Sequence, residues 1–248
     1  MKKLFTFFIL LCTFGFSFGQ WSPSTAQGEK IRNSSDRDEY YTLNISQIRS
    51  QLAKAQTTGK YSKAVEISVP ILGSGIETFE VYSLPVVVPE LATQYQLGSY
   101  VGVAKNDPGK YIRFSLAPDD FQSMIIINGV SQFIDPVNKA KSLYRVHPKT
   151  VPTGSKSFQC TMDEDLLSKQ QINDLYKSGN SFSKSKAADF SKSSDKKYRT
   201  MRLAMSVTAE YTTYFGGVTG ALTAINASLT RVNGVFEKDF GLHLNLQN

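Results

Sequence analysis

Two histidines and one cysteine are the residues of this chain best suited to bind a metal ion. A zinc site in a protein takes nitrogen, sulfur or oxygen ligands from about four positions, and the two histidines, His147 and His243, lie far apart in the sequence. His243 alternates with leucines on a predicted strand, and His147 stands at a predicted strand end. We therefore expect neither histidine to be a metal ligand and His243 to face polar surroundings.

The cysteine is Cys160, the only one left if the first 20 residues are removed, because Cys12 leaves with them. A lone cysteine in an exported protein is a free thiol, an intermolecular disulfide partner or a metal ligand. The acidic run that follows it, residues 163–165, is typical of a solvated face or a helix N-terminus rather than of a set of ligands.

The first 20 residues have the pattern of a secretory signal peptide. Lys2 and Lys3 precede the apolar residues 4–18, and Gly19-Gln20 is the expected cleavage point. We expect secretion, with the periplasm as a stage in transit. No other apolar run approaches the ~20 residues of a membrane helix, so no stable membrane anchor is predicted. The formal charge of +7 comes from scattered basic residues without interleaved aromatics, which argues against nucleic-acid binding.

The segment 21–60 precedes the main β region. We expect residues 21–38 to be polar and loose, residues 40–44 to form a short strand, and Ser46 to cap a helix over residues 47–56, with Ile48 and Leu52 on one face.

Residues 61–146 alternate between apolar and polar side chains, the pattern of half-buried strands. Asn128-Gly129 predicts a tight hairpin turn, residues 89–94 predict a short helical turn, and residues 143–146 predict a last strand. The region is therefore expected to form one mainly antiparallel β domain, extending to residue 160.

A linker is predicted over residues 161–197, with a brief helix over residues 166–176. Its last part, residues 178–197, is rich in serine and lysine and has few apolar residues. Such a segment is readily cut by proteases, and it ends in the dibasic pair Lys196-Lys197.

The last 51 residues predict strand, helix, strand. Met201–Thr208 alternate as a strand, Thr219 is the expected helix cap, and Gly241 the expected helix end. One apolar stripe is predicted on the helix, formed by Leu222, Ile225, Leu229, Val232 and Phe236. A β-α-β order implies two parallel strands, and two strands with one helix cannot bury that stripe alone. Glu210 and Glu237 lie at opposite ends of this unit and are not expected to act as a catalytic pair.

The two parts together resemble secreted bacterial zinc metalloproteases of the reprolysin type, within the metzincin clan. The resemblance rests on the following segments: Leu84–Val86, Pro89–Ala92, Ser99–Gly102, Ile112–Ser115, Phe133–Pro136, Arg202–Ala204, Thr208–Tyr211, Ala224–Asn226 and Arg231–Glu237. It implies an α+β chain with a signal peptide (1–20), a polar segment (21–60), a β-rich propeptide domain (61–160), a flexible linker cut on activation at Lys196-Lys197 (161–197), and the β-α-β start of a metzincin α/β domain (198–248).

The zinc motif of that family, H-E-x-x-H-x-x-G-x-x-H, is absent, and two histidines cannot supply its three ligands. We therefore expect the chain to be an inactive fragment of a zymogen truncated at Asn248, with zinc bound only in the intact parent and no calcium. The resemblance implies that the propeptide covers its own catalytic domain and that the parent cleaves peptides. Cys160 would then be a switch ligand to that zinc, a disulfide partner of the missing part, or an idle thiol. The alternative is a secreted propeptide-like binding module or protease inhibitor.

Overall fold

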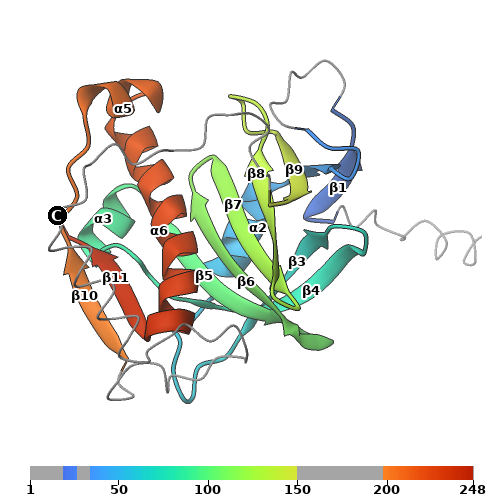
Figure 1. Ribbon diagram of the computed structural model, residues 1–248, viewed down its shortest axis with the longest axis horizontal. Helices are drawn as coiled ribbons and strands as arrows, with labels where there is room; N and C mark the ends of the chain where they lie inside the picture. The colour runs from blue at the N-terminus through green and yellow to red at the C-terminus, as the bar shows by residue number, and fades with distance from the viewer. Residues whose placement is uncertain (1–18, 27–33, 150–197, 248) are drawn as a thin grey trace, which may run out of the picture.

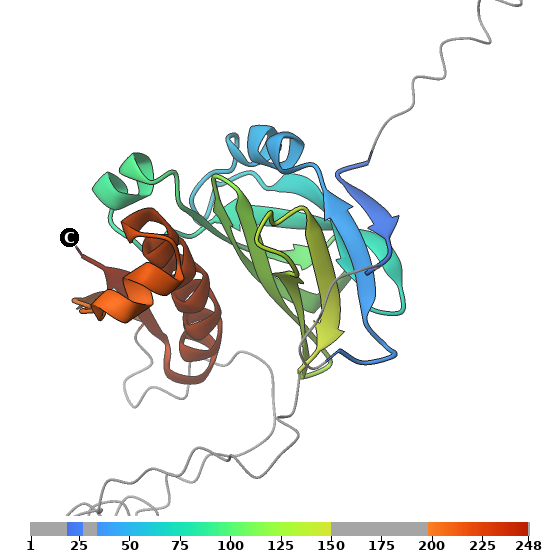
Figure 2. The same cartoon turned by 90° about the horizontal axis from the view of Figure 1, so that it is seen from above.

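The computed structural model of the chain describes residues 19–26, 34–149 and 198–247. These residues form a large curved sheet and a smaller β-α-β unit beside it (Figures 1 and 2). We call residues 19–149 the sheet domain and residues 198–247 the C-terminal unit. Among the described helices, none is long and apolar enough to cross a membrane.

The sheet domain contains nine strands in the order β1-β2-β9-β8-β7-β6-β5-β4-β3, and every neighbouring pair is antiparallel. This confirms the mainly antiparallel architecture that the alternation predicts. The strands are β1 (Trp21–Ser24), β2 (Glu39–Leu43), β3 (Val65–Ile71), β4 (Gly75–Ser83), β5 (Gly98–Ala104), β6 (Asp107–Ala117), β7 (Asp120–Ile127), β8 (Val130–Pro136) and β9 (Leu143–Pro148).

The sheet curls until its first and last strands nearly meet. The indole Nε1 of Trp21 on β1 donates to the carbonyl oxygen of Ser68 on β3 at 2.8 Å, and the Gln20 side-chain oxygen accepts from the Ser68 amide at 2.7 Å. Side chains from both ends fill the interior, and Trp21 packs edge-on against Tyr41, Phe121 and Tyr144. The prediction that residues 21–24 are loose is therefore wrong, because Trp21, 2% exposed, belongs to the core.

Helix α2 (Ile45–Leu52) closes one opening of the curled sheet, with Ile48 and Leu52 buried as predicted. The predicted cap is wrong, since the helix starts earlier. The Asn44 side chain, not that of Ser46, accepts the hydrogen bond from the Gln47 amide at 3.2 Å, and both residue types are favoured caps.

Two other local predictions in the sheet domain are confirmed. Helix α3 spans Pro89–Gln94. Asn128 and Gly129 have φ values of 51° and 83°, the left-handed conformations that a two-residue hairpin turn of this type requires.

The C-terminal unit contains β10 (Arg199–Leu203), α5 (Ala209–Tyr214), α6 (Val218–Phe240) and β11 (Leu242–Leu246), and β10 and β11 are parallel as predicted. Gly241, at φ 62°, ends α6 as expected. In Figure 1, α6 lies between these two strands and the large sheet.

Two boundaries in the C-terminal unit differ from the prediction. Strand β10 ends at Leu203 instead of continuing to Thr208, because Thr208 caps the short helix α5 by accepting from the Tyr211 amide. The N-cap of α6 is Gly217, at φ 109°, and not Thr219. Cys160, the helix predicted over residues 166–176 and the dibasic pair Lys196-Lys197 lie outside the described residues.

Candidate functional site

The sheet domain and the C-terminal unit share one hydrophobic cluster. Its buried members are Val86, Val87, Leu91, Leu97 and Ala117 from the sheet domain and Ile225, Leu229 and Leu246 from the C-terminal unit. Helix α6 lies along one face of β5, β6 and β7, as Figure 2 shows from above. The apolar side of the C-terminal unit is thus covered by the sheet domain, which is the partner that a lone β-α-β unit needs.

Residues 86–88 extend the small parallel sheet of the C-terminal unit. The Leu246 amide donates to the Val86 carbonyl oxygen at 2.8 Å, and the Val88 amide donates to the Leu246 carbonyl oxygen at 3.0 Å. The pairing of Val87 with Leu246 is parallel. A segment of the sheet domain therefore occupies the outer edge of β11 by strand addition, a common mode of peptide recognition.

A first charged cluster joins β6 to α6. The Arg113 guanidinium, with a fully buried side chain, pairs with the Glu237 carboxylate, whose side chain is 12% exposed. The second carboxylate oxygen of Glu237 lies 2.7 Å from Nδ1 of His243, and Nε2 of His243 lies 3.0 Å from the Pro85 carbonyl oxygen. Gly234 allows this approach, since a Cβ there would lie 2.9 Å from Cγ of Arg113.

A second charged cluster joins α6 to β8 and β9, with the signs of the charges exchanged. The Arg231 guanidinium pairs with the Asp135 carboxylate and donates to the Ser123 carbonyl oxygen at 3.1 Å. Nε2 of His147 lies 3.0 Å from the other Asp135 oxygen. The Phe133 ring lies between, stacked on His147 and 5.3 Å from the Arg231 guanidinium carbon.

Neutral polar contacts continue along α6. The Asn226 side-chain amide donates to the Gly98 carbonyl oxygen at 3.0 Å, and the Thr230 and Ser99 hydroxyls are hydrogen-bonded to each other at 3.0 Å. Asn233 ties α6 to β11 by bonding both the amide and the carbonyl of Leu244 at 2.8 Å. The buried face of α6 is therefore partly polar, which the apolar stripe did not predict.

The stripe prediction is correct for Ile225 and Leu229, which are buried, and wrong for Val232, which is 37% exposed. The polar residues of the buried face, Asn226, Thr230 and Asn233, recur at spacings of three and four, so the helical period itself carried a signal for them.

The electrostatics of the second cluster keep Asp135 ionised. Burial alone would raise the pKa of Asp135, but the hydrogen bond from His147 and the positive charge of Arg231 outweigh it and hold this pKa below its ordinary value of 3.8. The carboxylate pairing therefore contributes stability that is fully present from about one pH unit above the unfolded pKa of 3.8 and is lost as the pH falls through the lowered pKa of the folded protein.

We expect Asp135→Asn to lower the free energy of unfolding by an amount that is constant above about pH 5 and shrinks at lower pH. Each unit by which the pKa is lowered corresponds to about 1.4 kcal/mol. Urea unfolding of the parent and the variant between pH 2 and pH 7 measures this difference. A difference that stays constant down to pH 2 would contradict the assignment.

The structure also shows the surroundings of the other residues that the sequence singled out. Gln20 is 5% exposed, and its carbonyl oxygen accepts from the Asn44 amide, whereas Gly19 is exposed. The prediction that His243 has polar neighbours is confirmed, and the imidazole lies buried against Glu237, a partner that the sequence did not predict. Glu210 is exposed at the start of α5 and lies apart from this interface.

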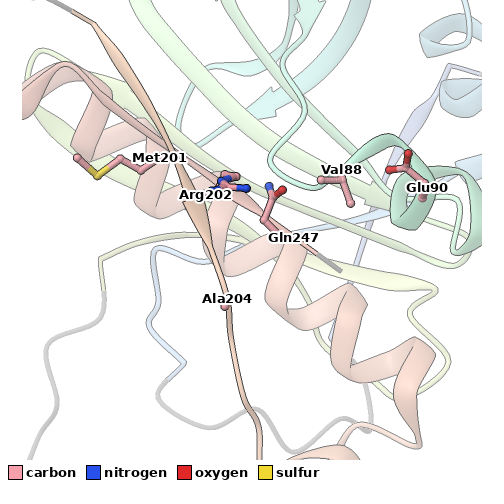
Figure 3. A pocket seen from close by; sticks show the side chains of 6 residues that line it. All are labelled: Val88, Glu90, Met201, Arg202, Ala204 and Gln247. Atoms are coloured by element: carbon pink, nitrogen blue, oxygen red, sulfur yellow. The ribbon is translucent and has the colours of Figure 1, made fainter.

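Nothing in the described ranges fits a zinc ion, because no group of three histidine, cysteine, aspartate or glutamate side chains comes together there. An open hollow does exist where β10 and β11 end beside α3. Figure 3 shows the side chains that line it, Val88, Glu90, Met201, Arg202, Ala204 and Gln247. These six side chains include no pair of metal-binding or nucleophilic groups.

The segments whose residues resemble reprolysin-type proteases supply this interface from both sides. Ser99, Arg113 and Asp135 come from the first set of segments, and Arg231 and Glu237 come from the second. Each segment carries the resemblance separately, and nothing in the sequence predicts that they meet.

Comparisons with known proteins bear on the C-terminal unit alone. Residues 197–248 match the family model described as metallo-peptidase family M12B, reprolysin-like. No curated protein and no solved structure matches the chain. The C-terminal unit is therefore related to the reprolysin-like metallopeptidases, a family whose proteases depend on zinc.

Proposed function

We propose that the chain carries the propeptide and the first β-α-β unit of a secreted zinc metalloendopeptidase zymogen. The observation that carries the proposal is the docking of residues 198–247, which lie within the reprolysin-like match, on the sheet domain that precedes them. In the intact parent, the protease domain would hydrolyse peptide bonds and the sheet domain would hold it latent.

Activation would then follow a cut in the linker, at or near Lys196-Lys197, after which the sheet domain is no longer covalently joined to the protease. In this proposal Cys160 is a ligand that the propeptide offers to the zinc of the parent. Both positions rest on the sequence alone.

Secretion through the signal peptide belongs to the same proposal. Gln20 and Trp21 are buried in the sheet domain, and cleavage after Gly19 would keep both of these core residues in the mature protein. N-terminal sequencing of the exported protein should give Gln20 as the first residue. An exported protein that still carries Lys2 and Lys3 would contradict this part of the proposal.

The deciding experiment is to sequence the coding DNA for a few hundred bases beyond the codon for Asn248. An open frame that reaches H-E-x-x-H-x-x-G-x-x-H supports the zymogen. A stop codon directly after Asn248 removes catalysis and leaves a binding or inhibitory protein. The 248-residue chain itself is expected to cleave no peptide and to bind no stoichiometric zinc, as measured by elemental analysis of the purified protein.

A further inference from the structure

We infer that the sheet domain is a recognition surface for the C-terminal unit as a non-covalent partner, and that two crossed ion pairs determine the direction in which α6 binds. The partner is residues 198–247 of the same chain, once the linker is cut. The inference deepens the proposed function, on which it rests for the role of this docking, but its evidence is the geometry of the interface.

The two ion pairs have opposite polarity. The sheet domain presents a positive group, Arg113 on β6, and a negative group, Asp135 on β8. Helix α6 presents the complementary groups, Glu237 and Arg231. These two residues are six apart, which corresponds to about 9 Å along a helix.

Reversing the direction of α6 would bring like charges together. Arg231 would then face Arg113, and Glu237 would face Asp135. In the first pair both side chains are nearly removed from solvent, at 0% and 12% exposure, so water would not screen the repulsion there. Unfavourable pairing in the wrong arrangement is how charged groups give an interface its specificity.

Other contacts of α6 with the sheet, among the described residues, involve uncharged groups. Asn226 and Thr230 bond a backbone carbonyl and a hydroxyl, and the shared cluster is apolar. Such contacts contribute affinity but distinguish poorly between the two directions of a helix. Among the contacts along α6, the charged residues are therefore the ones that favour one direction over the other.

The pairing of residues 86–88 with β11 is consistent with the same direction of α6. Residues 86–88 bind β11 in parallel, and β11 follows α6 directly at Gly241, so fixing one fixes the other. The surface therefore fits a unit with a helix that carries an arginine and a glutamate six residues apart, followed by a strand with a free edge.

The test uses the full chain with a site-specific protease sequence inserted between residues 161 and 197. The protein is cut under native conditions and applied to gel filtration, and the two pieces are expected to elute together. Arg231→Glu and Glu237→Arg, introduced singly, should each weaken the complex of the cut pieces on the order of 100-fold, so that the pieces separate at concentrations where the parent pieces do not.

Asp135→Asn provides the coupling test. With an uncharged partner at position 135, Arg231→Glu meets no like charge, so its effect should be at least about tenfold smaller than in the parent background. Lys238→Glu is the matched control, since it reverses a charge on the exposed side of the same helix and should leave co-elution unchanged. Circular dichroism of the uncut variants shows whether each variant folds, so that weaker binding of the two pieces is distinguished from misfolding.

Three outcomes would overturn the inference. The parent pieces could separate at once, or Lys238→Glu could weaken the complex as much as Arg231→Glu does. The third is that Asp135→Asn does not reduce the loss of affinity caused by Arg231→Glu. Failure of the proposed function is distinguishable. If the cut pieces elute together but a stop codon follows Asn248, the recognition surface stands and the zymogen proposal fails. If the pieces separate but the open frame reaches the zinc motif, the zymogen proposal stands and the recognition surface fails.

Discussion

Arg113→Met is expected to lower the free energy of unfolding by about 3–5 kcal/mol, because it removes one partner of a buried ion pair and leaves the other charge without compensation. Methionine keeps the unbranched stem that packs under Gly234, so the change addresses the charge more than the volume. The Glu237 carboxylate would remain almost buried beside His243. Urea unfolding followed by far-ultraviolet circular dichroism measures the loss.

Two further variants make the Arg113 result specific. Adding Glu237→Gln removes the stranded charge while keeping the shape of the side chain, so the double variant should regain much of the lost stability. Lys105→Met removes a cation from an exposed pair with Glu66 and should cause no measurable change. Equal losses in the single and the double variant would mean that the charge is not the cause.

Strands, turns and helix ends could be predicted because each depends on residues close together in the sequence. The alternation of Ile112, Phe114 and Leu116 with their polar neighbours shows which face of β6 is interior. The Asn128-Gly129 turn and the end of α6 at Gly241 follow from conformations that few residue types adopt.

The docking interface could not be predicted, because its partners are far apart in the sequence. Nothing near Arg113 indicates that its carboxylate comes from position 237, and nothing near Arg231 indicates Asp135. A hydrophobicity pattern also places polar residues outside, so it misassigned the buried face of α6, where Asn226 and Thr230 find partners on β5. Polar residues at helical spacing were the signal available.

The position of Trp21 shows the same limit at the other end of the sheet domain. The residues that follow it are polar, and nothing local predicts a strand. Its ring contacts come from β2, β7 and β9, and its hydrogen bond comes from β3. A single large side chain with distant partners thus decides the structure of its segment.

Trp21→Ala is accordingly expected to destabilise the sheet domain by about 3–5 kcal/mol, the usual cost of removing a large buried aromatic side chain. Trp21→Phe keeps an aromatic ring in the core but loses the hydrogen bond to the Ser68 carbonyl oxygen. The loss of this hydrogen bond should account for about 1 kcal/mol of the destabilisation. Tyr61→Ala, at an 85% exposed aromatic residue, should change the stability by no more than about 0.5 kcal/mol. Trp21 is the only tryptophan, so circular dichroism rather than fluorescence must follow these variants in urea. If Trp21→Ala cost no more than Tyr61→Ala, β1 would not close the sheet. The expected order of losses follows from the position of Trp21 at the meeting point of the first and last strands, where its removal opens the core from its edge.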